Sequence, residues 1–181
     1  MTDKMTLITV KDTGHVLAAL SRAADPEAAL TPAVLAGEYM SVRYIGNPTG
    51  IGYGDNEFQI KPDQLDVVIT DLDADVITTP RSFYVDPDKK VQPADASGVT
   101  PVFTTNAQIR ITVGAVPQEC KVRVEIIDVS DPTERQAVTG KIALNATQTV
   151  ISLRPLKATS VYEVLTLVQT FMPDRRNINT P

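Results

Sequence analysis

The sequence predicts a mainly β protein built from antiparallel sheets. Hydrophobic and polar residues alternate over much of the second half, most clearly at residues 107–113 and 121–128. This period of two places the apolar side chains on one face of a pleated strand. The intervening segments are rich in proline, aspartate and glycine, as turns between antiparallel strands are. Because 43% of the 181 residues are hydrophobic, the chain can form a globular core, and disorder of the whole chain is excluded.

The first elements are predicted from apolar runs and from capping residues. Two apolar runs, residues 7–10 and 15–20, flank a turn rich in aspartate and glycine, which favours a hairpin. A helix over residues 15–24 is the alternative, because alanine and leucine favour helices. Downstream, Asp25 and Thr31 each precede a proline, and Gly37 provides a stop, so one or two short helices are expected.

The remaining elements are predicted as strands separated by short turns. In the first half the predicted strands are residues 38–45, 57–60, 65–70, 75–79 and 82–85. In the second half they are residues 107–113, 121–128, 140–144, 149–153 and 161–171. In the two clearest strands, one set of side chains should face the core and the other should face water. The expected core set is Ile109, Ile111, Val122, Val124 and Ile126, and the expected solvent set is Gln108, Arg110, Lys121, Arg123 and Glu125.

A change of composition divides the chain into domains. Residues 87–101 are rich in proline, aspartate and lysine, as a linker or a long surface loop would be. The prediction is therefore a mostly β N-terminal domain (1–86) with one or two short helices, this linker, and a C-terminal domain (102–171). The second domain, with about five predicted strands, has about the size of a minimal immunoglobulin-like antiparallel β-sandwich, and Tyr162 is a candidate tyrosine corner. Residues 172–181 are polar and are expected to form an extended C-terminal tail.

The charge of the chain excludes two classes of partner. A net charge of −5 opposes binding to nucleic acid or to anionic lipid, because both require a positive surface. We therefore expect no nucleic-acid partner and no membrane partner. No apolar run reaches the roughly 18 residues of a transmembrane helix, the N-terminus lacks a signal-peptide core, and a single cysteine forbids an internal disulfide. Synthesis in the cytoplasm is the resulting expectation.

The residues that carry most enzyme chemistry are scarce. His15 is the only histidine and Cys120 the only cysteine, and nothing in their surroundings indicates a catalytic dyad rather than a turn histidine and an inert thiol. The serines lack the Gly-x-Ser-x-Gly context of a nucleophile elbow, and the glycines lack the spacing of nucleotide-binding loops. We expect no enzymatic activity, no catalytic residue and no cofactor.

An acidic segment is the one candidate for metal binding. Asp71, Asp73 and Asp75 recur at every second position, and calcium prefers several oxygen ligands. A helical calcium loop that began at Asp71 would need glycine at its sixth position and glutamate at its twelfth, where the chain has Val76 and Ser82. The prediction is a solvated acidic turn without a metal.

Two segments are predicted to contact partners. The first is a glycine-rich loop that carries Gly50, Gly52, Tyr53 and Gly54, since long loops on rigid sheets often hold binding surfaces. The second is the tail, in which Arg175 and Arg176 could pair with carboxylates of a neighbouring subunit.

These features predict a non-enzymatic structural subunit of a larger assembly, such as a phage-tail-like, capsid-associated or filament particle. Its partners would be other copies of itself or other subunits, and a virion or tail-like particle would be its destination. The alternative is an immunoglobulin-like binding or adhesion module that recognises a protein or a glycan through its loops.

Overall fold

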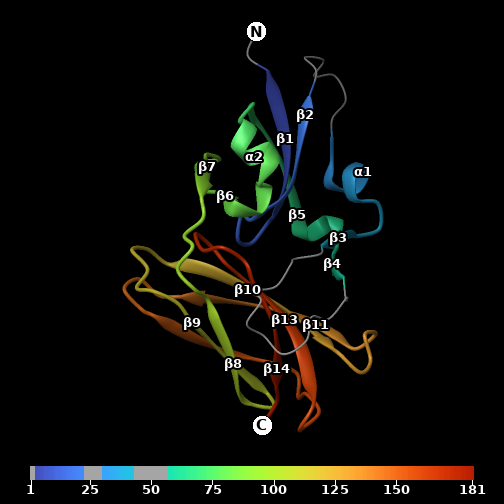
Figure 1. Cartoon of the computed structure of the whole chain (residues 1–181), viewed down its shortest axis with the longest axis vertical. Coiled ribbons are helices and arrows are strands. Elements are labelled where there is room, and N and C mark those ends of the chain that lie inside the picture. The colour runs from blue at the N-terminus through green and yellow to red at the C-terminus, as the bar shows by residue number, and fades with distance from the viewer. Residues whose placement is uncertain (1–2, 23–29, 43–56) are drawn as a thin grey trace. The chain divides into compact units, whose positions relative to one another are not determined.

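The computed structural model describes residues 3–22, 30–42 and 57–181 and shows a mainly β protein with several small antiparallel sheets and two short helices (Figure 1). By its internal contacts the chain forms two units, Met1–Val42 with Gln59–Ala94, and Arg43–Phe58 with Asp95–Pro181. The predicted helix near Asp25 lies outside the described residues, as do the last three positions of the predicted strand 38–45 and the glycine-rich loop.

The first unit is organised around the predicted hairpin. Strands β1 (Lys4–Val10) and β2 (Val16–Arg22) pair antiparallel, and β5 (Leu65–Asp71) pairs with the other side of β1. The helix alternative for residues 15–24 is therefore wrong, because pairing with β1 outweighs the helix preference of alanine and leucine. A tight turn closes the hairpin, in which Gly14 has a φ of +74° and its N–H donates to the Val10 carbonyl at 2.7 Å.

Both helices begin at a side-chain cap. Helix α1 (Pro32–Ala36) is capped by Thr31, whose Oγ1 accepts the Val34 N–H at 3.3 Å, and it stops at Gly37 as predicted. Helix α2 (Ala74–Thr78) is capped by Asp73, whose carboxylate accepts the Asp75 N–H at 2.9 Å. The predicted strand at 75–79 is therefore wrong, since the Asp73 cap starts a helical turn there.

The other strands of the first unit are short. They are β3 (Met40–Val42), β4 (Phe58–Ile60), which begins at the boundary residue Phe58, β6 (Phe83–Val85) and β7 (Val91–Pro93). Strand β7 pairs with β6 and lies inside the predicted linker. The core under the β2–β1–β5 sheet consists of six buried side chains, Met5, Leu7, Val16, Val68, Val76 and Val85.

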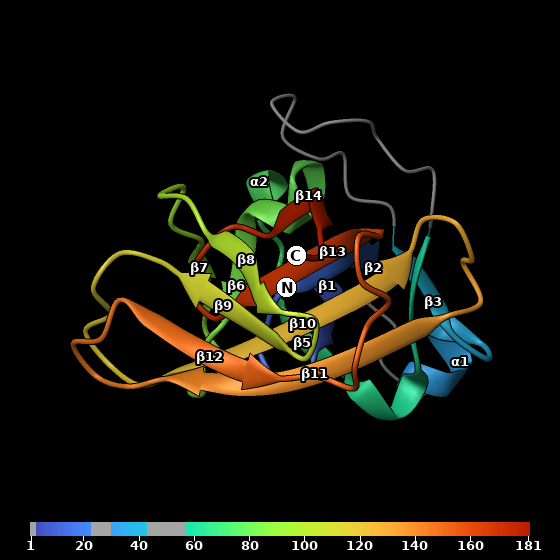
Figure 2. The ribbon, with the colours of Figure 1, turned by 90° about the horizontal axis from the view of Figure 1, so that it is seen from below.

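The second unit has two antiparallel sheets that share one hydrophobic core (Figure 2). One sheet has the order β11–β10–β13–β14 and the other has the order β12–β9–β8. The strands are β8 (Thr100–Thr105), β9 (Gln108–Thr112), β10 (Cys120–Asp128), β11 (Arg135–Ile142), β12 (Gln148–Ser152), β13 (Val161–Val168) and β14 (Asp174–Asn179). The five residues predicted for the core, Ile109, Ile111, Val122, Val124 and Ile126, are all buried in it.

Tyr162 forms the predicted tyrosine corner. Its hydroxyl accepts the backbone N–H of Lys157, five residues upstream, at 2.9 Å, and its ring meets Phe103 edge-on at 6.0 Å between centroids. Since Phe103 comes from the other sheet, Tyr162 ties the loop before β13 to the shared core.

The prediction that Arg123 and Glu125 face water is wrong. Both lie on the face of β10 opposite the core, but this face is also buried, and only 2% of Arg123 is exposed. The guanidinium of Arg123 and the carboxylate of Glu125 pair with each other at 2.6 Å. The alternation itself is present, but a charged residue can occupy a buried position when an opposite charge accompanies it.

Part of the predicted extended tail is a strand of the sheet. Residues Asp174–Asn179 form β14, which pairs antiparallel with β13 along its length, from Thr166↔Asp174 to Val161↔Asn179. A polar segment with no hydrophobic period can take this place because the backbone of β13 supplies hydrogen-bonding partners.

Candidate functional site

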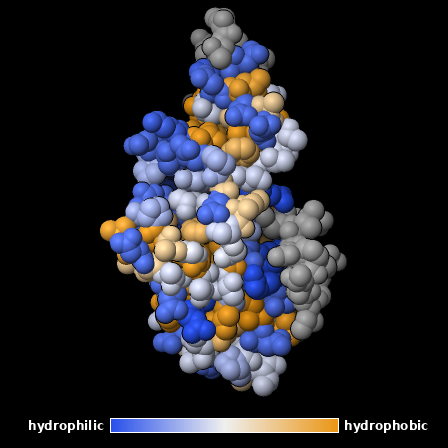
Figure 3. All heavy atoms as spheres, turned by 60° about the vertical axis from the view of Figure 1, so that its left-hand side comes forward, coloured by the Kyte–Doolittle hydropathy of each residue, from blue (hydrophilic) through white to orange (hydrophobic). Residues whose placement is uncertain are grey.

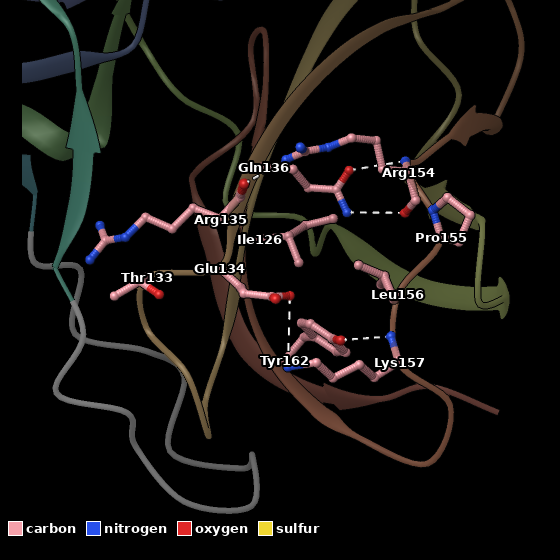
Figure 4. Close-up of a pocket in the computed structure, with 10 residues that line it drawn as sticks. All are labelled: Ile126, Thr133, Glu134, Arg135, Gln136, Arg154, Pro155, Leu156, Lys157 and Tyr162. Carbon is pink, nitrogen blue, oxygen red and sulfur yellow. Dashed lines mark hydrogen bonds and ion pairs between the residues drawn. The ribbon is translucent and has the colours of Figure 1, made fainter.

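The second unit carries an open cleft of about 460 Å³ between the start of β11 and residues 154–157 (Figure 4). We call it the 154–157 cleft. Its volume lies in the range that accommodates small ligands or side chains. Ten residues line it: Ile126, Thr133, Glu134, Arg135, Gln136, Arg154, Pro155, Leu156, Lys157 and Tyr162.

Hydrogen bonds hold the 154–157 segment beside β11. The side-chain amide of Gln136 accepts the Arg154 N–H at 3.1 Å and donates to the Arg154 carbonyl at 3.4 Å. At the other end of the segment, the Lys157 N–H donates to the Tyr162 hydroxyl. Leu156 is fixed between these two points, because its own N–H donates to the Asn106 carbonyl at 2.7 Å. The cleft is therefore formed before any ligand arrives.

The charged side chains around the cleft differ in how they are paired. Lys157 Nζ lies 3.1 Å from Asp128 Oδ2 and 3.7 Å from Glu134 Oε2, so two carboxylates face its ammonium group. The Arg135 guanidinium points away from the cleft in Figure 4 and donates to the carbonyls of Pro132 and Glu57. Arg154 crosses the edge of the cleft and donates to the Arg135 carbonyl at 2.8 Å. Among the described residues, no carboxylate pairs with Arg154.

Asp128 anchors this end of the sheet through a buried carboxylate. The side chain is fully buried, accepts the Ser130 hydroxyl at 2.6 Å and pairs with Lys157. Burial by itself raises the pKa of the Asp128 carboxyl, but the hydrogen bonds from Ser130 and Lys157 outweigh burial and hold the pKa below its usual value. The ionised form is therefore favoured in the folded state.

We expect the change Asp128→Asn to lower the free energy of unfolding at pH 7 by about 2 kcal/mol, because it removes charge-assisted hydrogen bonds. A depressed carboxyl pKa stabilises the fold above the unfolded-state value near ~3.9, and this stability disappears as pH falls through the folded-state pKa. The variant should thus lose less stability than the native chain on acidification below about pH 4. Urea unfolding from pH 7 to pH 3 measures this, with the exposed Glu119→Gln as control; equal acid sensitivity of the native chain and the Asp128 variant would contradict it.

A second candidate surface is the outward face of the β12–β9–β8 sheet, shown with its three strands side by side in Figure 2. Cross-strand pairing places Val102 and Val150 on either side of Arg110. We define the outer sheet face as the outward-facing residues of these strands that pair across the sheet: Thr100, Val102, Gln108, Arg110, Thr112, Gln148, Val150 and Ser152. Arg110 is the only charged residue among these eight.

Hydrophobic side chains are also exposed elsewhere on the molecule. On the face drawn in Figure 3 they form small groups separated by hydrophilic residues. In the second unit, Val150 is 52% exposed and Val102 is 39% exposed. The outer sheet face differs from the scattered sites because its two valines lie in one cross-strand row.

The residues predicted to contact partners lie in two places. Gly50, Gly52, Tyr53 and Gly54 lie outside the described residues. In the structure, Arg175 pairs with the buried carboxylate of Glu163 and stacks over Phe58 at 5.5 Å.

Arg176 pairs with Asp174 and donates to the Val99 carbonyl at 3.0 Å. Both arginines thus have partners within their own chain, which sequence alone could not identify because Glu163 and Val99 lie far away in the sequence. Contact of Arg175 and Arg176 with a neighbour remains a prediction.

The structure also shows where the residues considered for catalysis or metal binding lie. His15 is fully buried beside the Thr13 hydroxyl at 2.9 Å, and it belongs to the first unit while Cys120 belongs to the second. Burial raises the pKa of the Cys120 thiol, against an opposing hydrogen bond from Thr170. Asp73 caps α2, and Asp71 pairs with Lys4 at 2.5 Å. Within the described ranges no group of three or more His, Cys, Asp or Glu side chains is placed to hold a metal ion.

Sequence reasoning did not find the 154–157 cleft or the outer sheet face. The cleft combines residues from four separate segments of the sequence. The row Val102–Arg110–Val150 required β8, which was not predicted, because Pro101, Val102 and Phe103 are consecutive apolar residues and only their burial in the structure alternates. Neither helix in the described part of the chain is long and apolar enough to span a membrane.

The fold and these two surfaces define a mainly β protein with candidate binding surfaces on its C-terminal unit. No protein-family model matches the sequence, and no curated protein matches it. Among solved structures, the chain is similar to a superoxide reductase (neelaredoxin) from Ignicoccus hospitalis, with 15% identity, a TM-score of 0.30, and coverage of 48% of this chain and 81% of that chain.

The chain is also similar to the BSP domain of a biofilm associated protein, with 12% identity and a TM-score of 0.27. This match covers 98% of the present chain and 25% of that chain. Both likenesses are distant and concern β-rich structure only.

Proposed function

We propose that the chain is a non-enzymatic structural subunit of a larger protein assembly, such as a phage-tail-like, capsid-associated or filament particle. The outer sheet face is the observation that carries this proposal. Protein interfaces are depleted in charged residues at their centres, and arginine is enriched there. A row of two exposed valines with a single arginine between them, surrounded by threonine, glutamine and serine, has this composition.

We further propose that the second unit is an immunoglobulin-like β-sandwich. Its seven strands in a four-stranded and a three-stranded antiparallel sheet, with one core between them, support this class. The tyrosine corner at Tyr162 supports it as well. Such a unit offers rigid, β-branched faces for contacts with other copies of itself or with other subunits.

The change Val150→Glu tests the assembly proposal. A carboxylate in the centre of a desolvated contact costs several kcal/mol, so we expect the variant to sediment as a monomer at concentrations at which the native chain forms larger particles. Val161→Glu is the matched control, because Val161 is 41% exposed in the same unit but lies on the other sheet. Analytical ultracentrifugation and electron microscopy measure the outcome.

Two results would contradict the proposal. One is a native chain that stays monomeric at about millimolar concentration and that also forms no regular particle in a cell extract that contains the other subunits of the assembly. The other is assembly that survives Val150→Glu but is lost with Val161→Glu, which would place the contact on the other sheet.

A binding module is the second candidate function, and the 154–157 cleft favours it. A preformed cleft at one end of a rigid sheet is a common location for a recognition site. A native chain that remains monomeric and binds a ligand in the cleft would favour this function over the structural subunit.

A further inference from the structure

We propose that the 154–157 cleft binds a carboxylate that is attached to an apolar body. The carrier is either a small carboxylic acid or an acidic side chain in an apolar segment of a partner protein. This site is separate from the outer sheet face and does not depend on assembly through that face.

Leu156 and Pro155 give the cleft its apolar surface. Ile126 and Tyr162 lie beneath them and are only 1% and 3% exposed, so they support the cleft but offer a ligand almost no surface of their own. Leu156 is half-buried and its side chain points toward Ile126 in Figure 4, and the exposed Pro155 lines the cleft beside it. A ligand that covers these side chains removes apolar surface from water, which favours binding.

The positively charged side chains at the cleft favour a ligand that carries a negative charge. Asp128 and Glu134 already face the ammonium group of Lys157, and Arg135 points away, so Arg154 presents the available positive charge. Only one N–H group of its guanidinium donates to another described residue, which is Arg135 through its backbone carbonyl. A guanidinium offers five donors in a planar fork that matches a carboxylate, so four donors remain for a ligand.

Glu134 limits the charge of the ligand. Its carboxylate is 57% exposed in the wall of the cleft and lies 3.7 Å from the Lys157 ammonium. A group that carries two negative charges, such as a phosphate, would meet stronger repulsion from Glu134 than a carboxylate with one negative charge. The cleft therefore fits a monoanion better than a dianion.

Nuclear magnetic resonance titration of the full chain tests this site with matched pairs of probes. The small-molecule pair is 4-phenylbutyrate and the uncharged 4-phenylbutanol. The peptide pair is acetyl-Phe-Glu-Leu-amide and acetyl-Phe-Gln-Leu-amide. In at least one pair we expect the carboxylate to bind about tenfold more tightly than its neutral analogue and to shift the signals of Leu156, Lys157 and Tyr162. The pair that binds identifies the carrier, and higher salt should weaken binding.

Two variants and one control connect the binding to named residues. Arg154→Gln should weaken carboxylate binding by about tenfold, and Glu134→Gln should strengthen it by a few-fold, because the second change removes a like charge. Glu134→Gln keeps the size of an exposed side chain, so it tests the proposal even if Arg154→Gln disturbs the segment. Arg110→Gln, an arginine change on the outer sheet face, should leave binding unchanged.

Three outcomes would overturn the proposal. The first is the absence of saturable shifts at the cleft for every probe up to about 10 mM, a concentration that corresponds to very weak binding. The second is equal affinity for the acid and its neutral analogue in both pairs. The third is carboxylate binding that is unchanged in Arg154→Gln or weakened in Glu134→Gln.

Discussion

Truncation of Arg123 to alanine is expected to lower the free energy of unfolding by about 3–5 kcal/mol, because it leaves a buried carboxylate without its closest cation. The Arg123 and Glu125 side chains are 3% and 10% exposed, and Arg123 Nη2 lies 2.6 Å from Glu125 Oε1. Desolvation penalises the remaining charge far more than it would at the surface. Urea unfolding at pH 7 measures the loss.

The pH dependence identifies the cause of that loss. Burial raises the pKa of the Glu125 carboxyl, and Arg123 opposes the rise, so removal of Arg123 should raise this pKa further. A raised carboxyl pKa means that the folded state binds its proton more tightly than the unfolded state does, so stability increases as pH falls through the folded-state pKa. The deficit of Arg123→Ala should therefore shrink as the pH is lowered from 7 to 5.

An exposed ion pair provides the control for Arg123→Ala. Lys141 and Glu119 lie 2.7 Å apart with 61% and 55% of their side chains exposed, so Lys141→Ala should cost less than about 1 kcal/mol. Equal losses for Arg123→Ala and Lys141→Ala would contradict the buried position of the Arg123–Glu125 pair.

The change Gly14→Ala is expected to destabilise the first unit by about 2–4 kcal/mol. A Cβ at this position would lie 2.1 Å from the backbone carbonyl oxygen of Val85, and the φ of +74° disfavours any L side chain. The Gly14 carbonyl also accepts the Val85 N–H at 2.9 Å, so the turn cannot move away without breaking this bond.

The variant Gly37→Ala separates the two reasons why Gly14→Ala should be destabilising, the positive φ and the close contact with Val85. Gly37 has a similar φ of +63°, but apart from its chain neighbours no described residue has an atom within 4 Å of the position of its Cβ. Gly37→Ala should thus show the conformational cost alone, about 1 kcal/mol. Chemical denaturation of both variants measures the difference, and similar losses would show that the Val85 contact is unimportant.

Local signals in the sequence determined much of this fold. Alternation identified β9 and β10, because a period of two describes a strand with one face in a core. Thr31, Pro32 and Gly37 determined where α1 begins and ends, since caps act through neighbouring backbone groups. The Asp73 cap of α2 is a signal of the same kind.

Only the tertiary structure decided the features that depend on residues distant in the sequence. Alternation cannot show that the second face of β10 is also buried, because the burial of Arg123 depends on what surrounds that face. The polar segment Asp174–Asn179 becomes a strand because β13 offers unpaired backbone groups at its edge, and because Arg175 meets Glu163.

The 154–157 cleft also depends on residues that are distant in the sequence. Gln136 and Arg154 lie eighteen residues apart in sequence, and their hydrogen bonds form only when the two segments come together in the fold. Hydrogen bonds and ion pairs act over a few ångströms in space, so a sequence shows which groups are available but not which of them meet.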